Sequence, residues 1–297
     1  MANTSRENAC RYLDSQMVPP MRYAAIARGL YNKVVTLPAG KTSVDFDTIS
    51  EMGDALMEYH IPTGDMGFDN INVIPTVLRV PNIFKGWKLE RAELNAYLSE
   101  GKQIAAESAI SAMYVMLKKE ENFLLQGWYN PAGTKLLDGL YSGAGNDYAT
   151  AKAFSTDGLP TDAVLGGLAL NDADGVPPMN YNLILNPTQF RLLQANVSTT
   201  SNYNEMENIM KILNPMPGLQ GRIINDAKGN IVAGTGLLVP VDVTGAFFDL
   251  VVCEQPQNIF ANEKWPGKGP IEAMVFEAIV PRIKQAVSLC KLSNISG

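Results

Sequence analysis

The longest helical pattern in the chain runs from Ser99 to Gly127 and contains no proline. Apolar residues at steps of three, four or seven positions share one helix face: Ala106, Ile110, Met113, Leu117 and Leu124. A polar face carries Gln103, Glu107, Ser111, Lys118 and Asn122. Ser99 suits an N-cap and Gly127 a left-handed C-cap. We therefore predict a spine helix over residues 99–126, about 40 Å long.

Two oppositely charged segments precede this helix. Residues 1–33 carry five basic residues against two acidic ones. Residues 34–72 carry seven acidic residues against one basic residue. The segment Lys33–Ile49 contains two β-rich runs on either side of Pro38-Ala39-Gly40, which predicts a hairpin. A hairpin of this kind offers unpaired strand edges and covers no core of its own.

This charge pattern favours contacts between subunits. We expect the acidic hairpin to cross a neighbouring copy of the chain, with a surface flap as the alternative. For the basic arm, the alternatives are a solvated segment and a limb that lies on a neighbouring subunit or on packaged nucleic acid. The residues expected at the subunit interface are Arg6, Arg11, Arg22, Arg28, Lys41, Asp45, Asp47, Glu51, Asp54 and Glu58.

The remaining residues predict shorter elements. Residues 70–80 alternate as a strand in which Pro75 is tolerable only near a sheet edge. The glycine-rich segment 128–150 marks a boundary between sub-domains. Residues 151–256 are typical of an α+β sub-domain, with expected strands at 181–185, 222–224, 237–241 and 247–253 and expected helices at 187–196 and 205–213. Residues 271–292 predict two strands, before and after Pro281, that return to a sheet begun earlier.

Composition excludes several classes of protein. The 297 residues are 46% hydrophobic, enough for one large domain or two modest ones, and the net charge of −6 argues against a surface that binds nucleic acid throughout. Cys10, Cys253 and Cys290 are too few and too scattered for a disulfide framework. The chain shows no signal-peptide core and no apolar run long enough to span a membrane. We therefore expect an intracellular product without a membrane partner.

Catalytic signatures are scarce. The single histidine, His60, lies in the acidic segment, where nothing nearby in the sequence orients it as a base. Adjacent Glu120 and Glu121 point in different directions on a helix and do not form a facing pair. Gly143-Ala-Gly145 lacks the lysine of a phosphate-binding loop, and residues 171–175 lack the later ligands of a calcium loop. We predict no catalytic, cofactor-binding or metal site, which leaves shape and self-association.

The order of these elements resembles the Hong Kong 97-type capsid fold, which major capsid proteins of tailed viruses share with encapsulin shell proteins. The most similar blocks are the helix exit, KKEENFLLQGWYNPAGTKLLDGL at 118–140, and YNLILNPTQFRLL at 181–193. The resemblance implies an α+β fold with four parts. These are an N-terminal arm at 1–33, an extended loop at 34–72, a peripheral domain at 73–150 and 257–297 that contains the spine helix, and an axial domain at 151–256.

The resemblance also implies a homo-oligomeric icosahedral shell of pentamers and hexamers. The ending PRIKQAVSLCKLSNISG and the segment at 38–56 look closer to the viral branch than to the encapsulin branch. We therefore predict a virion protein that encloses double-stranded DNA and assembles in the host cytoplasm, with portal, scaffold or cement proteins as possible further partners. The alternative is an encapsulin shell around cargo enzymes. A carboxylate-dependent enzyme is a remote alternative.

Overall fold

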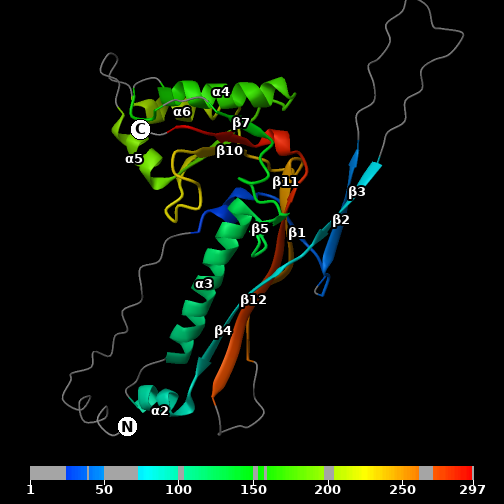
Figure 1. Cartoon of the computed structure of the whole chain (residues 1–297), viewed down its shortest axis with the longest axis vertical. Coiled ribbons are helices and arrows are strands. Elements are labelled where there is room, and N and C mark those ends of the chain that lie inside the picture. The colour runs from blue at the N-terminus through cyan, green and yellow to red at the C-terminus, as the bar shows by residue number, and fades with distance from the viewer. Residues whose placement is uncertain are drawn as a thin grey trace, which may run out of the picture.

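Two β-sheets, each with helices packed against it, organise the molecule (Figure 1). The computed structural model describes residues 25–38, 40–49, 73–99, 104–149, 153–156, 159–196, 204–260 and 270–295. The elongated part of the molecule holds the long helix. The other part holds three shorter helices, and a two-stranded hairpin projects from the region where the two parts meet.

The first sheet has four strands from both ends of the chain. Their order is β1 (Val34–Thr36), β11 (Phe248–Phe260), β12 (Ile271–Ile283) and β4 (Asn82–Leu89). β11 and β12 form a long antiparallel pair, and β1 joins β11 in parallel. Helix α3 (Ile104–Gln126) packs against β4 and β12. Strand β12 therefore returns, as predicted, to a sheet begun much earlier in the chain.

The second sheet has five short strands. Their order is β7 (Asn146–Tyr148), β13 (Cys290–Leu292), β10 (Gly236–Pro240), β8 (Tyr181–Leu185) and β9 (Ile223–Asn225). The helices of this part are α4 (Leu159–Ala173), α5 (Pro187–Ala195) and α6 (Glu205–Ile212). Helix α5 confirms the helix expected at 187–196: the Asn186 side chain caps it by accepting the Thr188 N–H, and Pro187 opens the first turn.

The sheets do not follow the predicted domain boundaries. The boundary at 256 falls inside β11, and β13 pairs in the five-stranded sheet although residues 257–297 were assigned to the peripheral domain. The predicted break at Pro281 is absent, since β12 continues to Ile283; the short helix η2 (Ala286–Ser288) follows, and the next strand, β13, begins only at Cys290. The ladder tolerates this proline because β4 pairs with β12 only as far as Ala278, so Pro281 has a strand on one side alone.

The described part of the predicted spine helix is α3, over residues 104–126. Helix α2 (Arg91–Ser99) ends where the long helix was expected to begin, and Ser99 donates its hydroxyl to the Ala96 carbonyl at 2.6 Å instead of capping α3. The other end is as predicted. Gly127 has φ +85°, and its N–H donates to the Phe123 carbonyl at 2.8 Å.

The buried face of α3 also differs from the predicted one. Ala112, Met116 and Glu120 are buried, whereas Ile110, which was expected to face the core, is 44% exposed. The periodicity was misjudged because a glutamate lies on the buried stripe, and a pattern of apolar residues cannot include it.

The hairpin predicted around Pro38–Gly40 is wrong. β2 (Ser43–Ile49) pairs with β3 (Val73–Arg79), whereas β1 belongs to the four-stranded sheet. The turn at Gly40, with φ +84°, therefore leads the chain from one sheet to another. Pro75 lies in a two-stranded sheet, where every strand is an edge, as expected.

Apolar cores lie beneath both sheets. The larger one joins α3 to the four-stranded sheet, and the smaller one lies under the three helices of the five-stranded sheet. After α3, a small hairpin of β5 (Trp128–Tyr129) and β6 (Lys135–Leu137) closes the helix end. Among the helices described, none combines the length and the hydropathy that a bilayer crossing requires.

Candidate assembly surfaces

The outward face of the β2–β3 hairpin carries an apolar row beside an acidic row. The register places Asp45 opposite Val77 and Asp47 opposite Pro75. Side chains two apart share a face, so Val73, Pro75 and Val77 form one row. Val73 is 56% exposed and Val77 is 62% exposed, so the subunit does not cover them. Asp45 and Asp47 are exposed beside them.

The base of the hairpin, in contrast, is anchored in its own subunit. Val44 is buried in the larger core, and Leu78 packs against that core. The Phe46 ring lies under the guanidinium of Arg282 from β12, with 5.5 Å between Cζ and the ring centroid. The expectation that this loop covers no core of its own is therefore wrong for the residues at the base of the hairpin. The exposed apolar row is not part of this core.

A second apolar surface lies where β4, the end of α3 and β5 meet. A cavity of about 260 Å³ is lined there by Pro81, Asn82, Ile83, Phe84, Lys119, Phe123, Gly127 and Trp128. Phe84 is 66% exposed and Trp128 is 41% exposed at its rim. Lys119 is also exposed on the same side of α3. This surface therefore combines apolar rings with a positive charge, the counterpart of the apolar and acidic rows on the hairpin.

Arg28, one of the expected interface residues, forms ion pairs within its own chain. It lies in the short helix η1 (Ala27–Leu30). Its Nε is 2.8 Å from Glu120 Oε1 on α3, and its Nη2 is 3.0 Å from Glu277 Oε2 on β12. Nearby, Glu121 accepts the Ile26 N–H at 3.0 Å. The charge of Arg28 therefore ties the start of the described chain to the spine helix and the sheet.

The two carboxyls beside Arg28 titrate abnormally. Glu277 is completely buried. Burial, with the nearby Glu120 carboxylate, raises the pKa of Glu277 to about 8. Burial likewise raises the pKa of Glu120, although Arg28 opposes the rise. Glu120 and Glu121 contact different groups, as their adjacency on a helix predicted. Glu277 was not among the expected site residues, although a lone acid in the apolar run AMVFEAIV indicates a buried polar contact.

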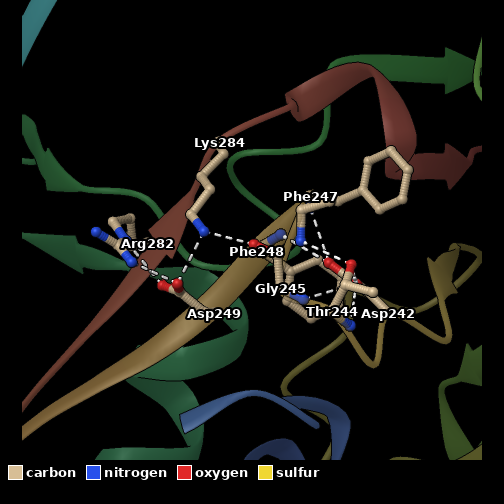
Figure 2. Close-up of polar contacts among 9 residues, drawn as sticks. Asp242, Thr244, Gly245, Phe247, Phe248, Asp249, Arg282 and Lys284 are labelled. Carbon is tan, nitrogen blue, oxygen red and sulfur yellow. Dashed lines mark hydrogen bonds and ion pairs between the residues drawn. The ribbon is translucent and has the colours of Figure 1, made fainter. Parts of the chain in front are cut away.

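The two sheets are joined by a second polar cluster (Figure 2). Asp242, after β10, accepts the N–H groups of Gly245 and Phe247, both at 2.8 Å, and so shapes the turn into β11. These backbone N–H groups, together with Thr244, lower the pKa of Asp242, although burial opposes them. The turn between β10 and β11 is thus held by a single carboxylate.

Next to it, Asp249 is 1% exposed and pairs with two cations (Figure 2). Arg282 binds both of its oxygens, with Nε 2.8 Å from Oδ1 and Nη2 2.5 Å from Oδ2. Lys284 Nζ is 2.9 Å from Oδ2 and also donates to the Gly245 carbonyl. These contacts join the first residues of β11 to the last residues of β12, at the end of the four-stranded sheet from which the chain connects to the five-stranded sheet.

The expected interface residues therefore fall into three groups. Lys41, Asp45 and Asp47 are exposed. Arg28 pairs within the subunit. Outside the described residues lie Arg6, Arg11, Arg22, Glu51, Asp54 and Glu58, together with His60. Within the described part of the chain, no three His, Cys, Asp or Glu side chains are grouped so that they would hold a metal ion.

Comparison with known families decides between shell and enzyme. The family described as "Encapsulating protein for peroxidase" (Linocin_M18) matches residues 54–244. The chain belongs to this family. None of the curated proteins matches the sequence. This Linocin_M18 protein is therefore a shell-forming structural protein rather than an enzyme.

Solved structures confirm the predicted α+β Hong Kong 97-type fold for this Linocin_M18 protein. The virus-like particle from Pyrococcus furiosus is 18% identical, with a TM-score of 0.59 over 88% of this chain and 89% of its own. The capsid of Myoviridae phage XM1 is 12% identical, with a TM-score of 0.72 over 96% and 97%. Mycobacterium phage Cain is 12% identical, with a TM-score of 0.66 over 98% of both chains.

Proposed function

We propose that this protein is the shell subunit of an encapsulin-type nanocompartment, which encloses a cargo protein such as a peroxidase. The observation that carries the proposal is the family match over residues 54–244. From the sequence alone, this function was the alternative to a viral capsid. Similarity to phage capsids at 10–12% identity supports a common fold and does not show whether the shell encloses a protein cargo or a DNA genome. In a cell, such a shell is a cytoplasmic compartment.

Assembly is proposed to use two different patches of each subunit. The outward face of the hairpin, with Val73, Val77 and the acids Asp45 and Asp47, meets the cavity beside Lys119 on the next copy. Apolar rows would then bury each other while acids face a base. Two different complementary patches on one chain give a head-to-tail contact, which closes into a ring when the rotation is suitable. Rings of five and six subunits are the closed units of an icosahedral shell.

Each such contact is modest on its own. Burying two valines contributes about 3–6 kcal/mol before the cost of association is subtracted. A closed shell nevertheless holds because every subunit takes part in many contacts at once. This arrangement gives a subunit that folds alone and a shell that forms above a threshold concentration.

The contents of purified particles test the proposal. Particles from the expressed chain are imaged by negative stain, treated with nuclease, and then opened and examined by absorbance and mass spectrometry. We expect closed shells with protein inside and no nuclease-protected DNA when the neighbouring genes are expressed together with the chain. A chain that remains monomeric in light scattering at all salt and protein concentrations would contradict the shell itself.

The second candidate is the viral major capsid protein predicted from the sequence. It is favoured by the excess of five bases over two acids in residues 1–33, a charge suited to packaged DNA. Protected double-stranded DNA in the particles would favour this candidate over the encapsulin. Portal, scaffold or cement partners would then become relevant.

A further inference from the structure

Arg282 makes two kinds of contact at once. Its guanidinium binds both oxygens of buried Asp249 and also lies over the ring of Phe46 in the projecting hairpin. The Arg282 side chain is only 14% exposed. Asp249 lies on β11, Arg282 on β12 and Phe46 on β2, so one side chain joins three strands of two different sheets.

Arg282 is not the only cation that balances the negative charge of Asp249. Lys284 Nζ lies 2.9 Å from the same carboxylate. Removing the guanidinium would therefore still leave a cation beside this buried acid. The contact with the Phe46 ring is different, because it depends on the reach and shape of the Arg282 guanidinium, which an ammonium group does not reproduce.

We propose that Arg282 is a positioning residue that fixes the direction in which the β2–β3 hairpin leaves the four-stranded sheet, and thereby fixes the size of the shell. This inference rests on the proposed assembly, in which the outward face of the hairpin meets the next subunit. The buried Asp249 holds the guanidinium in one orientation, and the guanidinium in turn holds the Phe46 ring.

The geometry makes the hairpin sensitive to its base. Seven residues at about 3.3 Å each give a strand of about 23 Å. Phe46 is the fourth of these residues, so a swing of about 10° there displaces Ile49, about 10 Å away, and its partner Val73 by about 2 Å. An error of that size shifts Val73 against the next subunit, whereas Val77, opposite Asp45, lies close to the pivot and moves little. Subunits would still associate, but at altered angles.

Three variants separate positioning from stability. Arg282→Lys keeps a cation for Asp249 and removes the guanidinium from the Phe46 ring, and Phe46→Leu keeps an apolar side chain and loses the ring. Lys284→Met is the matched control, because it removes the other cation of Asp249 without touching Phe46. Shell diameters are measured by mass photometry and electron microscopy, and subunit stability is measured by the melting temperature.

We expect a single diameter for the unaltered chain and for Lys284→Met, with a lowered melting temperature for the latter. Arg282→Lys and Phe46→Leu should each give two or more size classes. The double variant should show a spread of diameters no larger than that of either single variant, because all three lose the same contact. Unchanged diameters in both single variants would overturn the inference, as would equal broadening in Lys284→Met.

A second measurement keeps the inference testable apart from assembly. Spin labels on D47C and K85C, in a C10S background, report the distance from hairpin to sheet in unassembled subunits. We expect Arg282→Lys and Phe46→Leu to broaden the distance distribution at least twofold and Lys284→Met to leave it unchanged. Equal distributions would refute the role of Arg282 even if shells form normally. A monomeric chain with the expected distributions would refute the proposed function alone.

Discussion

Replacing Glu277 by glutamine should make the subunit more stable at alkaline pH and leave it nearly unchanged at acid pH. The glutamine oxygen still accepts from Arg28, and its amide can donate to Glu120, so the variant resembles protonated Glu277. Burial raises the pKa of Glu277 from 4.5 to about 8. Between these values the folded chain holds a proton that the unfolded chain has lost. The free energy of unfolding therefore falls as pH rises through this window and levels off above it.

The size of the effect follows from the same shift. One pKa unit corresponds to about 1.4 kcal/mol, so a shift of about 3.5 units gives at most about 5 kcal/mol. For a chain of this length, that corresponds to a difference of roughly 10 °C in melting temperature. We expect the E277Q advantage to be near zero at pH 4.5 and to reach its maximum above pH 8.

The assay is denaturant unfolding of unassembled subunits at half-unit steps from pH 4.5 to 9. The exposed Glu90 offers a matched control, and E90Q should follow the unaltered chain at every pH. Parallel stability curves for E277Q and the unaltered chain would refute the reasoning, because they would show that Glu277 is ionised in the folded state across the whole range.

Three further variants test other parts of the structure. Reversing charge with D45K and D47K together should abolish or strongly weaken assembly, measured by light scattering, while circular dichroism of the subunit stays unchanged; normal shells would remove the electrostatic part of the assembly proposal. Asp242→Ala should lower the free energy of unfolding by about 3 kcal/mol in denaturant titrations, because buried N–H groups of Gly245 and Phe247 lose their acceptor. Gly127→Ala should cost at least about 3 kcal/mol on the same measurement, since φ is +85° and a Cβ would lie 2.3 Å from a backbone oxygen; a change below 1 kcal/mol would contradict this view of the helix end.

The parts of the fold that were predictable from sequence depend on local signals. Gly127 and Asn186 have the chemistry of a helix C-cap and N-cap, and both occupy those positions. The resemblance of whole blocks, such as residues 181–193, then identified the fold. Neither kind of signal requires knowledge of which strands pair.

The errors arise where pairing between distant segments decides the structure. The turn at Gly40 looks like a hairpin turn, yet the strand before it pairs with β11, some 215 residues later in the chain. The buried face of α3 was misplaced because Glu120 belongs to it, and that glutamate is buried only because Arg28 and Glu277 converge on it. A periodicity of apolar residues carries no information about such partners.

Of the candidate surfaces, the charged residues were predictable from the sequence and the apolar residues were not. Their acidic residues, Asp45 and Asp47, stand out as charges in the sequence. Their apolar partners Val73 and Val77 look like ordinary strand residues, and only the structure shows that they are exposed. Phe84 and Trp128 are 44 positions apart and come together only when α3 lies back along β4.

Isolated acids inside apolar strands mark the places where this subunit has to be rigid. Asp249 holds β11 to β12 at the junction of the sheets, and Glu277 holds β12 to the spine helix through Arg28. Apolar contacts alone tolerate sliding and rotation, whereas a buried carboxylate that must meet a fixed donor specifies one arrangement, even though it adds little net stability. A closed shell multiplies any angular error of its subunit around every ring, so orientation matters there more than stability. Both acids therefore lie where a shell subunit gains most from a single, fixed geometry.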